Sequence, residues 1–343
     1  MSAPVDFPRA ARRAARLAPP GPRGTASELN ALVAGLRDAA ATAPKHVGRI
    51  TGLVTEAERA AANPVLIVDR AGWSRANAAL MAHASDGILP PAGRIGAALA
   101  GEETGALLAY LSTKVLGQFD PFTPGGPRLL LVAPNVLTIE RELDLDARDF
   151  RRWVALHEQT HAVQFAAAPW LADHLLGALG SAVAPGATDT DRDVRALIPT
   201  LVKAVRSRGE TESIEIAGPL VDSFLAPTER EKLTQIVALM SLLEGHADVV
   251  MDAVGPMLLP SVKRIRSSFD RRRDGRGPVD VLLRSLLGMR AKVAQYRNGA
   301  AFVRTVVRRV GHAGLNAAWT GPELLPTPDE LLDPGAWISR VHG

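Results

Sequence analysis

The sequence predicts a mainly α-helical protein with a small β-sheet. From Asp146 onward apolar residues recur with helical spacing, and only the apolar runs 65–68 and 129–132 have the composition of buried strands. A chain of 343 residues, 47% hydrophobic and 22% charged, has the balance of a folded globular protein. We expect an N-terminal lobe, 1–145, with helices and the small sheet, and a helical lobe, 146–343, packed together as one compact unit.

The helices of the N-terminal lobe are bounded by residues that start or stop helices. Pro19 and Pro20 cannot continue a helix, so the first helix ends before them. Ser27 is expected to be the N-cap of the second, because its hydroxyl can accept from a free backbone N–H. The sequence predicts helices over 5–18, 26–44 and 94–116, and a loop rich in proline and glycine over 118–126.

The helical lobe contains one long helix with a marked beginning. Thr228 and Glu231 have capping-box spacing, in which the hydroxyl accepts from the N3 amide and the carboxylate accepts from the N-cap amide. This long helix begins after Pro227 and runs to about Ala253. The expected helices of the lobe are 148–167, 170–183, 227–253, 279–297 and 299–311, and the expected polar loops are 185–193 and 206–215.

Composition excludes several classes of protein. The chain has no cysteine, so it has neither disulfides nor thiolate metal ligands. Its net charge of +4 is too small to indicate nucleic-acid binding, and no run reaches the roughly 18 apolar residues of a membrane span. We therefore expect no nucleic-acid partner, no membrane partner and a cytoplasmic location. One basic cluster is expected to be a solvated connector: Lys263, Arg264, Arg266, Arg271, Arg272, Arg273 and Arg276.

The strongest chemical signal is the sequence His157-Glu158-Gln159-Thr160-His161 inside a predicted helix. Residues four apart lie about one helical turn, ~6 Å, from each other on the same face, so one zinc ion can bind both imidazoles. Glu158 then lies beside the metal as a general base. The flanking residues are apolar on nearly all sides, and buried imidazoles need a compensating partner. The pattern therefore predicts a zinc site rather than two surface histidines.

A catalytic zinc site normally has a third protein ligand. Gln164 and Ala167 occupy the positions at which a related motif has glycine and a third histidine, so that motif is excluded. The long helix offers Glu244, which we assign as the third ligand, and Asp248 one turn later, which can accept the outer N–H of a ligating histidine. His246 is the rival ligand or a further outer partner, and His174 is a more distant alternative.

Gly245 lies in the middle of this long helix, next to the expected ligand Glu244. Glycine in a helix interior costs about 1 kcal/mol relative to alanine. This cost is tolerable where the helix must press closely against a neighbour. We therefore expect a close helix–helix contact at Gly245.

Several segments resemble an actinobacterial family of zincin-like, zinc-dependent metalloproteases, one branch of which is associated with deazaflavin cofactor biosynthesis. The resemblance covers nearly the whole chain. It implies a mostly helical zincin-like architecture with the zinc site between two buried helices, zinc held by His157 and His161, Glu158 as catalytic acid/base, and hydrolase activity. The matching segments are 153–165 (WVALHEQTHAVQF), 169–171, 242–252 (LLEGHADVVMD), 68–73, 115–120, 131–135, 295–296 and 325–338.

We expect the reaction to be hydrolysis of a peptide or amide, with Glu158 moving the proton. An additional donor for the oxyanion is expected to be Tyr296 or His246, and the strand 129–132 is the candidate edge strand for aligning an extended substrate. The competing interpretation is a non-catalytic binding or scaffold protein in which zinc only cross-links two helices.

Overall fold

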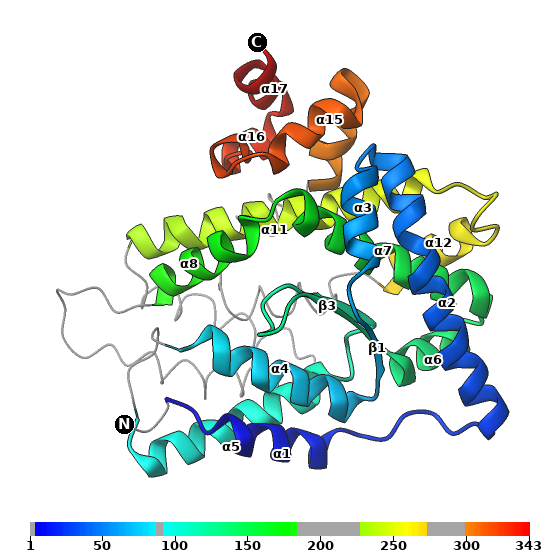
Figure 1. Ribbon diagram of the computed structural model, residues 1–343, viewed down its shortest axis with the longest axis vertical. Coiled ribbons are helices and arrows are strands. Elements are labelled where there is room, and N and C mark those ends of the chain that lie inside the picture. The colour runs from blue at the N-terminus through cyan, green and yellow to red at the C-terminus, as the bar shows by residue number, and fades with distance from the viewer. Residues whose placement is uncertain (1–3, 87–91, 184–226, 273–298) are drawn as a thin grey trace.

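The computed structural model describes residues 4–86, 92–183, 227–272 and 299–343 (Figure 1). It confirms the mostly helical fold with a small sheet. The described helices are α1 (Phe7–Leu17), α2 (Ala26–Thr51), α3 (Val54–Ala61), α4 (Arg70–Ala84), α5 (Arg94–Leu111), α6 (Ala133–Glu142), α7 (Ala147–Ala167), α8 (Leu171–Val183), α11 (Pro227–Ala253), α12 (Val262–Arg272), α15 (Gly299–Leu315), α16 (Pro328–Leu332) and α17 (Pro334–His342), with the short 3₁₀ helices η2 (Asn316–Trp319) and η3 (Pro322–Leu324).

The expected helices in the described residues are present, with shifts at their ends. The long helix 227–253 and the helix 170–183 agree with α11 and α8 to within a residue. The helix expected over 94–116 ends earlier, at Leu111, because the chain turns there to enter a strand. The expected helix 279–297 and the loops 185–193 and 206–215 lie outside the described residues.

The sheet has three strands, β1 (Val65–Val68), β2 (Gly117–Asp120) and β3 (Arg128–Val132), in the order β1-β3-β2. β1 is parallel to β3, and β2 is antiparallel to it. The strand 129–132 is thus central, and its interpretation as an edge strand is wrong. The edge next to it is β2, in a stretch expected to be a loop. An edge strand pairs on one side only and remains half-buried, so it needs no apolar run, and its sequence Gly-Gln-Phe-Asp gave no strand signal.

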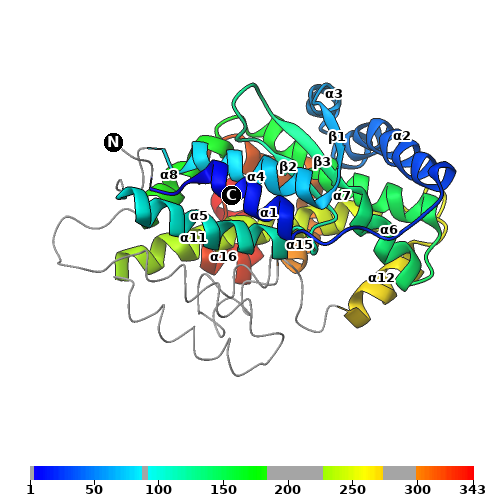
Figure 2. The same cartoon turned by 90° about the horizontal axis from the view of Figure 1, so that it is seen from below.

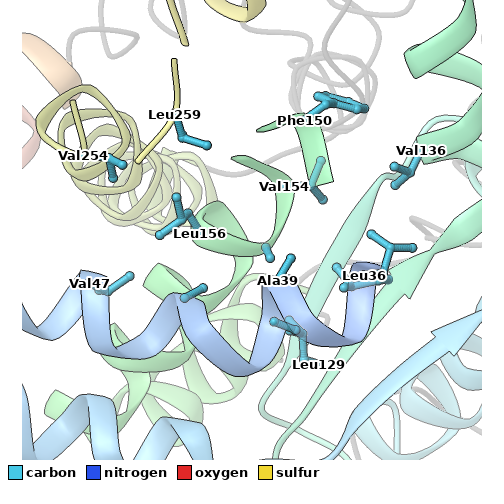
Figure 3. Close-up of a cluster of buried hydrophobic side chains, with 14 of the residues drawn as sticks. Leu36, Ala39, Val47, Leu129, Val136, Phe150, Val154, Leu156, Val254 and Leu259 are labelled. Carbon is cyan, nitrogen blue, oxygen red and sulfur yellow. The ribbon is translucent and has the colours of Figure 1, made fainter. Parts of the chain in front are cut away.

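The central strand β3 is covered on both faces. Its alternating side chains divide between two core clusters, because successive residues of a strand point to opposite faces. Leu129 and Leu131 face α2 and α7, whereas Leu130 and Val132 face α1, α4 and α5. In the view from below, α1 and α5 lie side by side under the sheet (Figure 2). The largest cluster contains Leu36 and Val47 of α2, Leu129 of β3, Phe150 and Leu156 of α7 and Val254 near α11 (Figure 3).

The beginning of α2 differs from the expectation. The N-cap is Thr25, not Ser27: the Thr25 hydroxyl accepts from the Glu28 N–H at 3.2 Å, and the Glu28 carboxylate accepts from the Thr25 N–H at 2.7 Å. This reciprocal capping box satisfies two backbone donors, whereas a serine cap satisfies one. The second helix therefore begins two residues before the position that a serine cap at Ser27 would give.

α2 also continues through Pro44 to Thr51, beyond the predicted end at residue 44. A proline inside a helix leaves the carbonyl four residues earlier without its usual donor. Here that carbonyl belongs to Ala40, and it accepts a hydrogen bond from the side-chain amide of Gln159 on α7 at 3.1 Å. A partner helix thus satisfies the group that proline leaves open, which sequence periodicity alone does not reveal.

α11 lies between α8 on one side and α15 and α16 on the other (Figure 1). A Cβ atom added at Gly245 would overlap the backbone of Gly299 and Ala300 in α15, and one added at Gly299 would overlap the backbone of Ser241 in α11. The two glycines therefore allow the helix backbones to touch. The close helix contact expected at Gly245 is confirmed.

Replacing Gly245 with alanine is expected to lower the free energy of unfolding by about 1–3 kcal/mol, because backbone atoms of α15 cannot move aside as a side chain can. Gly177, which lies mid-helix in α8 with open space where a Cβ would be, is the matched control. Gly177→Ala should raise stability by up to about 1 kcal/mol. Urea denaturation of both variants measures the difference, and equal stability of the two would contradict the close contact.

The core cluster of Figure 3 joins residues from both sides of position 145. The division into lobes 1–145 and 146–343 stays a prediction. In the part of the chain that the structure describes, no helix has the length and apolar character needed to cross a membrane. The expected cytoplasmic location also stays a prediction.

Candidate metal centre

The helix α7 positions both histidines of the motif. It begins with Asp146 as N-cap, whose carboxylate accepts from the Asp149 N–H at 2.9 Å, and most of its faces are buried. His157 and His161 lie one turn apart, with their rings roughly perpendicular and their Nε2 atoms 3.2 Å apart. Two imidazole nitrogens at this distance repel each other unless a proton or a metal ion lies between them.

Glu244 approaches the same point from α11. Its Oε2 lies 3.5 Å from His157 Nε2, and its Oε1 lies 3.5 Å from His161 Nε2. The three side chains are partly exposed, with Glu244 at 35% the most accessible. Within the described residues, these three form the group of acidic and histidine side chains whose ligand atoms lie within 4.8 Å of one another. The structure therefore brings together the three residues that the sequence predicts as ligands.

The spacing of these atoms fits zinc. Ligand atoms about 2.1 Å from a tetrahedral zinc ion are separated from one another by about 3.4 Å. The two Nε2 atoms lie 3.2 Å apart, and each lies 3.5 Å from a different oxygen of the Glu244 carboxylate. One ligand atom from each of the three residues lies within 4.8 Å of the other two, so a small adjustment of the carboxylate brings them to zinc spacing. Two imidazoles and one carboxylate are also the donor set of many catalytic zinc sites. His157, His161 and Glu244 are thus able to hold one zinc ion and leave a fourth position open.

Glu158 is buried beside this group, against strand β2. Burial raises the pKa of Glu158 to about 7. The nearby Glu244 also raises this pKa, whereas His161 and a hydrogen bond from the Phe119 backbone lower it. The Cα of Gly117 lies so close that a Cβ there would be 2.5 Å from Glu158 Cγ. β2 therefore forms one wall of the Glu158 pocket, and a carboxylate whose pKa lies near neutrality can both take and return a proton.

Each histidine has a partner for its outer nitrogen. His157 Nδ1 lies 3.3 Å from the thioether sulfur of Met251, and His161 Nδ1 lies 2.9 Å from the side-chain oxygen of Gln164. Both partners can only accept, so each Nδ1 carries the proton and each Nε2 has its lone pair available. Sequence reasoning missed both residues. The position of Gln164 three residues after His161, on the same helix face, is the signal that could have identified it.

Asp248 lies one turn after Glu244 on α11, as expected from their spacing. Its carboxylate forms an ion pair with Arg266 of α12 at 3.0 Å, and Arg266 also donates to the Asp248 backbone carbonyl at 2.7 Å and pairs with Asp252 at 2.8 Å. This network holds α12 against α11. The role of Asp248 as acceptor for the outer N–H of a ligating histidine stays a prediction.

The structure places His246 away from the group of ligands. It is fully buried on another face of α11, where its Nδ1 lies 3.0 Å from the Gln164 amide nitrogen and its ring packs beside Trp319. Burial lowers the pKa of His246 to about 3, and the nearby His312 and His161 act in the same direction. His246 is therefore a neutral partner of Gln164 at neutral pH.

The other candidate residues do not join the group of ligands in the described residues. His174 is on the exposed side of α8, where its ring contacts Trp170. Tyr296 lies outside the described residues. In the basic cluster, Arg264 pairs with Asp144 at 2.7 Å, and Arg266 pairs with Asp248 and Asp252. Arg273 and Arg276 lie outside the described residues. The expected absence of a nucleic-acid partner stays a prediction.

Comparisons with known proteins identify the family of the chain and a similar solved structure. A family model of zincin-like metallopeptidases matches residues 5–338. A crystal structure from Chloroflexus aurantiacus, described as "a putative hydrolase with a novel fold", is similar in fold, with 29% sequence identity, a TM-score of 0.65 and coverage of 98% of each chain. No curated protein matches. Because the family model spans nearly the whole chain, the chain belongs to the zincin-like metallopeptidase family.

Proposed function

We propose that this protein is a zinc-dependent metallopeptidase in which His157, His161 and Glu244 hold the metal and Glu158 is the general base. The observation on which the proposal rests is the convergence of two imidazoles and one carboxylate, with ligand atoms within 4.8 Å of one another, next to the Glu158 carboxyl, whose pKa burial raises to about 7. Family membership and the hydrolase description of the structural neighbour support a metallohydrolase. Assignment to the actinobacterial, deazaflavin-associated branch has its support in the sequence resemblance alone.

Bound zinc would supply a Lewis acid that polarises a carbonyl and lowers the pKa of water. The chain's own residues supply the proton transfers. Glu158 takes a proton from the attacking water and returns it to the leaving amine, and the Phe119 backbone N–H orients its carboxylate. Tyr296 is the proposed additional donor to the oxyanion. His246 is withdrawn from that role, because it is fully buried behind Gln164.

The strand proposed to align the substrate is β2 rather than β3. Among the described strands, β3 is paired on both sides, whereas β2 is paired with β3 alone, and its Phe119 backbone N–H reaches the Glu158 carboxyl. An extended peptide can add to such an edge through backbone hydrogen bonds. The proposed peptide-binding edge is thus beside the proposed general base.

Metal content by mass spectrometry, with turnover of a broad peptide library, tests the proposal. The wild type should contain one zinc per chain and cleave peptides. Glu244→Ala removes one of three protein ligands and should weaken zinc binding by at least about 100-fold, with loss of cleavage. Glu58→Ala, a change on the exposed side of α3, is the control and should leave both properties unchanged.

Three results are distinguishable. Zinc together with cleavage supports the peptidase. Stoichiometric zinc without cleavage of any peptide favours the scaffold interpretation, in which the metal only joins α7 to α11. Absence of zinc from the purified wild type, with no uptake of added zinc, contradicts the metal site itself.

A further inference from the structure

Gln164 connects the two helices of the metal centre. Its side chain is fully buried on α7 and makes three polar contacts. The oxygen lies 2.9 Å from His161 Nδ1, and the amide nitrogen lies 2.9 Å from the Leu243 backbone carbonyl and 3.0 Å from His246 Nδ1. Leu243 directly precedes the proposed ligand Glu244 in the chain. One amide therefore touches a proposed ligand on α7 and the backbone beside a proposed ligand on α11.

The surroundings allow this amide only one orientation. The Leu243 carbonyl can accept a hydrogen bond but cannot donate one, so the NH₂ group must face it. The opposite orientation would bring two oxygen atoms to 2.9 Å in a buried place, with no hydrogen bond between them. Fixing the NH₂ group at Leu243 leaves the Gln164 oxygen facing His161 Nδ1.

The orientation of the amide determines the tautomer of His161. An oxygen acceptor 2.9 Å away requires the proton to be on Nδ1, so Nε2 keeps its lone pair. That Nε2 is the atom facing His157 and Glu244. We infer that Gln164 is a positioning residue, which holds His161 in the tautomer and ring orientation that can bind metal. Through its hydrogen bond to Leu243, Gln164 also links the orientation of His161 to the position of α11. The inference rests on the proposed metal site.

His246 completes this arrangement. The second hydrogen of the Gln164 amide points to His246 Nδ1, which therefore accepts, and the His246 proton is on Nε2. In the described part of the chain, Nε2 of His246 has no hydrogen-bond partner, although it is buried. Burying an unpartnered N–H is costly. The role of His246 as acceptor for Gln164 gives a reason for a histidine at this position.

Gln164→Met tests the inference, because methionine fills nearly the same volume without the amide. Zinc affinity of the full-length protein is measured by competition with a chelator of known affinity. Loss of the outer partner of one ligand should weaken zinc binding about 10–100-fold. The matched control is Gln159→Met, which removes another buried glutamine of α7 whose amide binds Ala40 on α2 and no ligand. Gln159→Met should lower thermal stability but change zinc affinity by less than about threefold.

The pair of variants separates positioning from general stability. Zinc affinity in Gln164→Met equal to that in Gln159→Met would overturn the inference, while tight zinc binding by the wild type would leave the proposed metal site intact. Failure of the wild type to bind zinc would instead contradict the proposed function.

A second measurement does not depend on the folding of the variant. Nitrogen-15 NMR of the zinc-free wild type should show His161 protonated at Nδ1, whether or not Nε2 shares a proton with His157. A His161 protonated at Nε2 alone would overturn the inference even if Gln164→Met does not fold.

Discussion

Glu158→Gln is expected to lower peptide turnover by about 10³-fold while zinc content stays at one per chain. Glutamine has nearly the same shape and can still occupy the buried place beside β2, so the fold and the three proposed ligands are expected to be retained. It cannot accept a proton at neutral pH, so the attacking water and the leaving amine lose their proton carrier. Peptide-cleavage assays measure turnover, and metal analysis of the same samples measures zinc content.

The control for this prediction is Glu58→Gln, the same chemical change on the exposed side of α3. It should have wild-type turnover and zinc content. Unchanged turnover in Glu158→Gln would remove Glu158 from the mechanism. Loss of zinc together with turnover would show instead that the carboxylate supports the metal site.

Local sequence signals were sufficient where one element determines the structure by itself. A capping pattern and an apolar run predict the helix α11, and spacing on a single helix predicts that His157 and His161 meet at one point. Glu244 could be predicted because a carboxylate inside an apolar helix needs a compensating partner. These inferences use periodicity and burial, which are properties of a continuous segment.

The features that the sequence did not reveal depend on contacts between distant segments. The continuation of α2 through Pro44 depends on Gln159, more than a hundred residues away. Strand β2 has no apolar run, and it is a strand because β3 pairs with it. In the sequence, Gln164 is an ordinary helix residue, and its role depends on contacts with Leu243 and His246 of α11 that only the fold creates. A single sequence does not identify these distant contact partners.

Gly117→Ala is expected to lower kcat by about 100-fold with zinc content unchanged, since a misplacement of about 1 Å near reacting groups has effects of this size. The φ angle of Gly117 is not in the left-handed region, so the position needs glycine for space and not for conformation. A Cβ there would lie 2.5 Å from Cγ and 2.8 Å from Cδ of Glu158. The buried carboxylate has to move away, whereas His157, His161 and Glu244 are not displaced by this contact.

The control is Gly93→Ala at the N-cap of α5, where a Cβ would meet nothing within 4 Å. Steady-state kinetics should show wild-type kcat for Gly93→Ala and a selective loss for Gly117→Ala. Turnover of Gly117→Ala within about twofold of the wild type would show that the closeness of β2 does not position the general base. A loss of the expected size with zinc retained would show that β2 contributes to proton transfer by holding Glu158 in place, independently of its proposed role as a substrate-binding edge.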